Sequence, residues 1–324
     1  MQRHNRRRLA LALVAVGLFA MAGPTARSQS PRTIKLILPF APGGPAYALA
    51  RILAEQIGVS GGPTVVVENR PGAGTEIGTE YVARAEPDGG TIGMISNSLV
   101  VLPHLRKVNY DPFKDLEPIC ELATFPPLIV VENESPYHTL ADLISAARAR
   151  PGTLTMASNG PGTSSQIAVE MLKRAAKIDM TFIPYSGYTP AIAAVMGNQV
   201  TSALADYSEL HGQLATGKLR ALATTLARRI PPLPDVPTVA ESGYPGFEAE
   251  FFAGLIAPAK MPAPTIKELT GLFTAAMQPA DIKAKLAELG LYPVNACGTD
   301  FAAILHKQYD EYGQIIREAN IKLE

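Results

Sequence analysis

The sequence contains no tryptophan, only two cysteines and only 6% aromatic residues. Its 29 Lys and Arg residues balance its 29 Asp and Glu residues, so no net charge favours nucleic acid or an anionic membrane surface. The scarcity of aromatic side chains argues against a stacking surface for single-stranded nucleic acid. We therefore expect no nucleic-acid partner, and any recognition of anions must be local.

Signatures of metal binding and catalysis are also missing. The five histidines, at positions 4, 104, 138, 211 and 306, never lie three or four residues apart, so no helical metal-ligand pair exists. There is no G-x-S-x-G motif, and neither cysteine has neighbours that suggest an activated thiol. We expect a protein that is not an enzyme and has no metal or cofactor, with a Ser/His/Asp site assembled from distant residues as the alternative.

The one long apolar run lies at the N-terminus. Four arginines at positions 3, 6, 7 and 8 precede the apolar stretch 9–21, and small residues follow it, which is the layout of a secretory signal peptide. This stretch is too short to span a membrane comfortably. We predict a signal peptide over residues 1–28, with cleavage after Ser28 or Ala26, and a periplasmic mature chain; an uncleaved anchor is the alternative.

Export would place the two cysteines where a disulfide can persist. Whether Cys120 and Cys297 pair depends on geometry that the sequence does not give. A chain of 324 residues does not need a covalent staple, so we favour two buried thiols over a disulfide.

Strand patterns that run into glycine-rich or hydroxyl-rich loops recur along the chain. An apolar strand over 34–38 enters P-F-A-P-G-G at 39–44 and then a helical pattern to residue 57. The same order of strand, loop and helix returns at 65–82 and at 153–172, and a short strand over 91–95 ends in a polar loop at 96–98. Loops at the carboxyl ends of strands are where open α/β sheets bind ligands, and free amides at helix starts suit an anion. The pattern predicts an α/β protein that binds a small anion.

The chain divides into two α/β halves. Pro126-Pro127 separates two apolar strands, and the apolar strand 251–257 leads back towards the first half, before a mostly helical C-terminal region. We predict one lobe from residues 31–124 plus 253–324 and a second lobe from residues 125–252.

Six segments carry a family resemblance. They are P-F-A-P-G-G (39–44), V-V-E-N-R-P-G-A-G (66–74), S-N-G-P-G-T-S-S (158–165), P-Y-S-G-Y-T-P-A (184–191), G-K-L-R-A-L-A (217–223) and L-P-D-V-P-T-V-A-E-S-G (233–243). Together, and in this order, they resemble the solute receptors of tripartite tricarboxylate transporters, the TctC-like Bug family. The resemblance runs from about residue 32 to the C-terminus.

This resemblance implies a two-lobed periplasmic-binding-protein fold (type II-like, "Venus flytrap"), with a mixed sheet flanked by helices in each lobe. It implies a monomer that captures a small carboxylate between its lobes, a di- or tricarboxylate or an aromatic acid, and delivers it to inner-membrane TctA/TctB-like transporter subunits. A ligand-sensing receptor without a transport role and a periplasmic hydrolase or transferase acting on small acids are the alternatives.

The ligand-binding residues are expected in the strand-end loops and beside them. They are Phe40, Ala41, Pro42, Gly43, Gly44, Tyr47, Gly72, Ala73, Gly74, Thr75, Glu76, Ser96, Asn97, Asn159, Gly162, Thr163, Ser164, Gln166, Tyr185, Asp206 and Phe252.

The chain departs from the family pattern at four of these positions. Tyr47 stands where an aspartate is usual, Thr75-Glu76 replaces Gly-Asn, and Gln166 replaces a histidine, whereas Asp206 matches the family's acidic position. Losing the aspartate removes a partner for a ligand ammonium, so we expect a dicarboxylate or aromatic acid rather than an amino acid. Two alternatives stay open: Tyr47 packs outside the cleft, and Glu76 serves only its own helix terminus.

Overall fold

The computed structural model describes residues 33–322 except 41 and 43, so the predicted signal peptide lies outside the described residues. Most of the first half of the chain and its C-terminal region form a six-stranded sheet in the order β11-β4-β10-β3-β1-β2. β1, β2 and β3 are parallel, whereas β10 and β11 run antiparallel to β4. The strands of this sheet are β1 (Thr33–Leu38), β2 (Thr64–Asn69), β3 (Thr91–Ile95), β4 (Leu116–Phe125), β10 (Phe251–Pro258) and β11 (Tyr292–Cys297).

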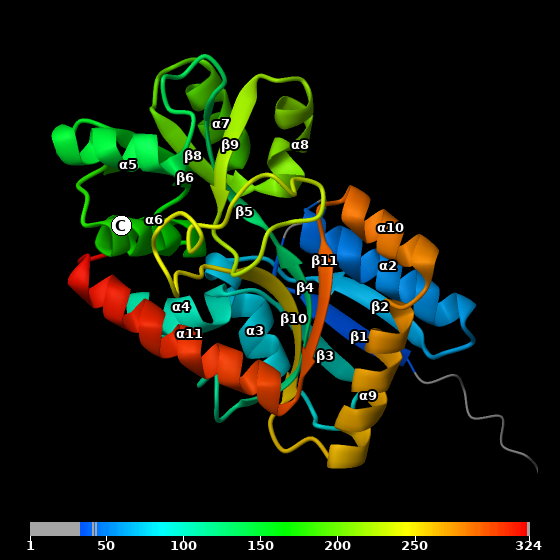
Figure 1. The fold of residues 1–324 in the computed structure, drawn as a ribbon. Helices are drawn as coiled ribbons and strands as arrows, with labels where there is room; N and C mark the ends of the chain where they lie inside the picture. Colours follow the sequence, from blue (N-terminus) through cyan, green and yellow to red (C-terminus); the bar gives the residue numbers. More distant parts are fainter. Residues whose placement is uncertain (1–32, 41, 43, 323–324) are drawn as a thin grey trace, which may run out of the picture. The chain divides into compact units, whose positions relative to one another are not determined.

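Helices cover both faces of this sheet, because its strands are apolar on both sides. Ile34, Leu36 and Leu38 enter one core cluster and Ile37 enters another, as the alternation of side chains along a strand requires. Figure 1 shows α2, α9 and α10 on one side and α3, α4 and α11 on the other. These helices are α2 (Pro45–Val59), η1 (Ala73–Thr75), α3 (Glu76–Ala83), α4 (Ser98–Leu105), α9 (Ala263–Ala276), α10 (Ala280–Glu288) and α11 (Thr299–Glu318).

The middle of the chain builds a second sheet of five strands, in the order β7-β6-β8-β5-β9. β6 lies parallel to β7 and β8, and β5 is antiparallel to β8 and β9, so this sheet is mixed as well. The predicted class, two mixed sheets each flanked by helices, is thus confirmed. The elements are β5 (Pro127–Glu132), α5 (Leu140–Ala149), β6 (Thr155–Asn159), α6 (Ser164–Ala176), β7 (Thr181–Tyr185), α7 (Tyr188–Met196), β8 (Ser202–Asp206), α8 (Tyr207–Ala215) and β9 (Leu219–Thr224).

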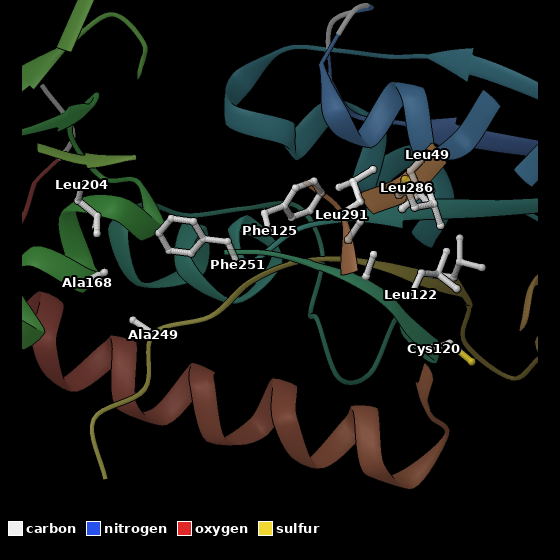
Figure 2. Close-up of a cluster of buried hydrophobic side chains, with 14 of the residues drawn as sticks. Leu49, Cys120, Leu122, Phe125, Ala168, Leu204, Ala249, Phe251, Leu286 and Leu291 are labelled. Atoms are coloured by element: carbon white, nitrogen blue, oxygen red, sulfur yellow. The ribbon is translucent and has the colours of Figure 1, made fainter. Parts of the chain in front are cut away.

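The two sheets are joined where β4 ends at Phe125 and β5 begins at Pro127, and again where the chain enters β10 at Phe251. One core cluster continues across this junction. Figure 2 shows Phe125 and Phe251 between Leu204, from the smaller sheet, and Leu291, beside the larger sheet. Buried side chains at the junction therefore link the two halves, in addition to the chain itself.

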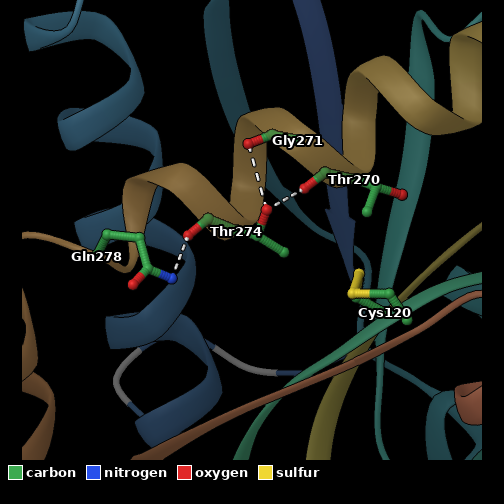
Figure 3. Close-up of a disulfide and its surroundings, with 6 residues drawn as sticks. Cys120, Thr270, Gly271, Thr274 and Gln278 are labelled. Carbon is green, nitrogen blue, oxygen red and sulfur yellow. Dashed lines mark hydrogen bonds between the residues drawn. A yellow bond between two sulfur atoms is a disulfide. The ribbon is translucent and has the colours of Figure 1, made fainter.

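The expectation of two unpaired thiols is wrong, because Cys120 and Cys297 form a disulfide. β11 pairs with β4 in a register that places these two residues directly opposite each other. β11 contains Pro293 and Asn295 and lies in a region that the sequence pattern predicted to be mostly helical. Figure 3 shows the bridge close to α9, where the Thr274 hydroxyl donates to the Thr270 carbonyl at 2.7 Å.

Two properties of the described residues bear on the expected functions. No helix among them is long and apolar enough to cross a bilayer. Residues 33–322, apart from 41 and 43, also hold no group of three or more His, Cys, Asp or Glu side chains arranged for a metal ion.

Candidate functional site

A pocket with a volume of about 630 Å³ lies where loops of the two sheets meet. Its walls combine the ends of β1, β2 and β3 with the loop that follows β6, so both lobes contribute to it. This is the position that open α/β sheets use for ligands. The lining residues are Pro39, Phe40, Gly72, Gly74, Thr75, Ser96, Ser98, Val101, Leu102, Arg106, Asn159, Pro161, Gly162, Thr163 and Ser164.

The turn between β2 and α3 shapes one wall of this pocket. Gly72, Ala73, Gly74 and Thr75 all have positive φ, at 132°, 46°, 57° and 90°. Glycine adopts such values without strain, whereas a Cβ on Gly72 would lie 2.6 Å from the Ile77 side chain. The turn closes on itself, because the Thr75 amide donates to the Gly72 carbonyl at 3.1 Å and the Glu76 amide donates to the Ala73 carbonyl.

Three hydroxyl groups line this wall and bond to one another. Ser98 Oγ lies 2.9 Å from both Thr75 Oγ1 and Ser96 Oγ. Thr75 is the N-cap residue of α3, and Ser98 is the first residue of α4. The first amides of both helices have partners: the Ser98 amide donates to Ser96 Oγ at 3.4 Å, the Leu99 amide to the Ser96 carbonyl and the Glu76 amide to the Ala73 carbonyl. This wall therefore offers its hydroxyl groups and the positive ends of two helix dipoles to an anion.

The opposite wall comes from the loop between β6 and α6. The N-cap Thr163 accepts from the Gln166 amide at 3.3 Å and donates to the Asn159 carbonyl at 2.8 Å. Gln166 Oε1 accepts from the Gly162 amide at 2.7 Å, so this side chain braces the loop and does not line the pocket. The predicted residues Asn159, Gly162, Thr163 and Ser164 all lie in the pocket wall.

Arg106 is the pocket residue that sequence analysis missed most clearly. It follows α4, and its Nη2 lies 3.0 Å from Glu76 Oε2 and also donates to the Ala73 carbonyl. The sequence pattern predicted only a polar loop at 96–98. The helix α4, which carries Arg106 to the pocket, was not predicted because it contains Pro103, a residue that is rare inside helices. A basic residue at a predicted helix end near a strand-end loop is the signal that could have found it.

The first predicted loop contributes less than expected. Phe40 lines the pocket, whereas Pro42 and Gly44 are exposed and outside its wall, and residues 41 and 43 lie outside the described residues. Tyr47 is partly buried and packs against the core of the larger sheet. Tyr47 is not among the residues that line the pocket.

Two further predicted residues on the larger sheet are used internally. Asn97 is 1% exposed; its amide donates to the Glu250 carbonyl and to Gln308 Oε1, and its Oδ1 accepts from the Phe252 amide. Phe252 is fully buried and packs edge-on against Phe301 at 5.5 Å between ring centroids. Neither side chain lines the pocket.

Tyr185 and Asp206 end β7 and β8 but do not line the pocket either. Tyr185 packs partly against the core beneath α7 and α8. Burial raises the pKa of Asp206 well above its ordinary value, and the Glu209 charge adds to this shift. Asp206 Oδ1 has no hydrogen-bond partner. Tyr188 lies beside Asp206, and the Tyr188 hydroxyl forms a hydrogen bond of 2.7 Å with the Ser165 hydroxyl.

No histidine or cysteine lines the pocket among the described residues, so nothing there resembles a nucleophile with its base. A second hollow of about 550 Å³ lies beside α11 and is lined by Arg174, Glu248, Lys307 and Glu311 among others. Arg174 and Lys307 are engaged by ion pairs with Glu318 and Glu248, and the hollow lies between α6, α11 and residues 243–248, away from the ends of β1, β2, β3 and β6. The strand-end pocket is therefore the candidate site.

Comparison with known proteins identifies similar receptors. A family model described as tripartite tricarboxylate transporter family receptor matches residues 49–321. The periplasmic binding protein BugD is 32% identical, with a TM-score of 0.73 over 91% of this chain and 100% of that chain. Rpa4515 of R. palustris with adipate is 29% identical, with a TM-score of 0.76 over 91% and 99%. MatC from Rhodopseudomonas palustris with bound malate is 29% identical, with a TM-score of 0.70 over 88% and 99%.

Proposed function

Because this chain belongs to the tripartite tricarboxylate transporter receptor family, whose members are solute-binding receptors rather than enzymes, we propose that its strand-end pocket binds a small carboxylate. One observation carries the proposal: hydroxyl groups and helix N-termini from both lobes line one cavity of about 630 Å³. The adipate and malate in two of the similar structures support a carboxylate as the ligand class.

Binding would proceed by direct hydrogen bonding without chemistry on the ligand. The hydroxyls of Thr75, Ser96 and Ser98 present donors from the first lobe, and Thr163 and Ser164 present donors from the second. A ligand held by both walls stabilises the arrangement in which they are close, so it favours closure of the lobes. We take these lobes as residues 31–124 plus 253–324 and residues 125–252.

The cellular compartment of the receptor and its transporter partners belong to the same proposal. BugD is a periplasmic binding protein, and we propose the same compartment for this chain after removal of residues 1–28. We propose that the monomer delivers its carboxylate to TctA/TctB-like subunits in the inner membrane. Ligand release there requires only reopening of the lobes, since no bond of the ligand has changed.

The test is a melting-temperature screen of the mature chain against mono-, di- and tricarboxylates, aromatic acids and amino acids. A ligand at one hundred times its dissociation constant adds about 2.7 kcal/mol of stability, or roughly 5 °C for a domain of this size. NMR of the recovered ligand should show it unchanged. The absence of a shift with every carboxylate, or the appearance of a product, would refute the proposal.

A pair of serine variants locates the binding site. Ser98→Ala removes the hydroxyl that contacts both Thr75 and Ser96, and we expect it to weaken carboxylate binding about tenfold. Ser60→Ala at the exposed end of α2 is the control and should bind as the unaltered chain does. Equal affinities for the two variants would place the ligand elsewhere.

A further inference from the structure

Arg106 is held in the pocket wall by the turn that precedes α3. Its Nη2 lies 3.0 Å from Glu76 Oε2 and donates to the Ala73 carbonyl, so one edge of the guanidinium faces the protein. Glu76 is the first residue of α3, and its side chain is only 13% exposed. Both residues depend on the turn at 72–75, whose left-handed backbone brings the Ala73 carbonyl to the guanidinium.

Part of the same guanidinium is open to the pocket. Arg106 lines the pocket and its side chain is 33% exposed, whereas its Nε is buried and has no hydrogen-bond partner. A guanidinium presents its N–H groups as a planar fork that matches a carboxylate. Because Nε is out of reach and Nη2 is engaged by Glu76, a ligand carboxylate would meet the exposed remainder of the guanidinium.

The position of Arg106 separates it from the hydroxyl cluster. Ser98 begins α4 and Arg106 follows its last residue, so their backbones lie about 12 Å apart along the helix. Between them, Val101 and Leu102 from the same helix line the pocket. The wall thus presents hydroxyl groups, then an apolar stretch, then a cation.

We propose that Arg106 is a specificity-determining residue that binds a second carboxylate of the ligand, with Glu76 as its positioning residue. This rests on the proposed function: the first carboxylate lies at the hydroxyls and helix N-termini, and the ligand's carbon chain lies against Val101 and Leu102. The ligand class is therefore an aliphatic dicarboxylate. Glu76 does not line the pocket and its carboxylate is paired with Arg106, so it offers no free partner to a ligand ammonium.

The test compares succinate, glutarate and adipate with their monomethyl esters by calorimetric titration of the mature chain. The half-ester keeps the carbon chain and one carboxylate, so we expect it to bind at least tenfold more weakly than the best diacid. Arg106→Gln should weaken binding of that diacid tenfold or more and change binding of its half-ester less than threefold. Arg84→Gln, which removes an exposed arginine paired with Glu80 on α3, is the control and should change neither.

The outcomes separate this inference from the proposed function. Equal affinity of diacid and half-ester for the unaltered chain would overturn the role of Arg106, and so would an Arg106→Gln variant that weakens both ligands equally. Failure of every carboxylate to bind would instead refute the proposed function. If Arg106→Gln does not fold, the half-ester comparison still decides, because it uses the unaltered protein.

Discussion

Glu121 should make the stability of this protein fall as pH rises. Its side chain lies inside the larger sheet on β4, is 0% exposed, and both of its carboxyl oxygens have no hydrogen-bond partner. Burial first, and then the charges of Glu250 and Glu248, raise the pKa of Glu121 to about 8. Glu250 behaves similarly, since burial and then Glu248 raise its pKa to about 7.

The sign and size of the effect follow from proton linkage. The folded chain holds the Glu121 proton more tightly than the unfolded chain, whose carboxyl has an ordinary pKa of 4.5. The contribution of Glu121 to the free energy of unfolding is therefore fully present below the unfolded pKa of 4.5, and it is lost as pH rises through the folded pKa of about 8. Each pH unit in this window removes about 1.4 kcal/mol, so Glu121 accounts for at most about 4 kcal/mol between pH 5 and pH 8.

Glu121→Gln isolates this contribution because it keeps the shape and removes the titration. We expect the variant to unfold at a similar temperature to the unaltered chain at pH 5 and up to about 8 °C higher at pH 8.5. Differential scanning calorimetry with the disulfide intact measures both. Glu117→Gln is the matched control, because Glu117 is exposed on the same strand. A difference between Glu121→Gln and the unaltered chain that does not change with pH would refute the reasoning.

Two other substitutions test the packing of the larger sheet. A Cβ on Gly254 would lie 2.4 Å from the Phe301 ring, so Gly254→Ala should lower the free energy of unfolding by about 1–3 kcal/mol in urea melts. The control is Gly271→Ala on α9, where the added Cβ meets open space and should not destabilise the protein. Equal stability of the two variants would contradict this packing. The disulfide joins residues 177 apart in the sequence, so Cys297→Ser should lower the free energy of unfolding by about 2–5 kcal/mol. A reductant should lower the melting temperature of the unaltered chain to that of the variant, and it should leave the melting temperature of the variant unchanged.

The loops of the candidate site were predictable because their signals are local. A strand followed by Gly, Ser or Thr and then a helical pattern is contained in about 20 residues, and Gly72, Thr75, Asn159 and Thr163 from such loops all line the pocket. The disulfide was not predictable in the same way. It depends on the register between β4 and β11, and β11 is an edge strand whose Pro293 and Asn295 obscure its pattern.

Whether a polar side chain in such a loop faces the ligand or braces the loop is decided by partners far away in the sequence. Asn97 sits between two serines that line the pocket, yet its hydrogen bonds go to Glu250 and Gln308, which are 153 and 211 residues away. Because the amide is buried and satisfied there, Asn97 fixes the positions of Ser96 and Ser98 instead of meeting the ligand. Arg106 shows the converse: it lines the pocket, and its guanidinium is held by Glu76 from a separate helix and by the Ala73 carbonyl.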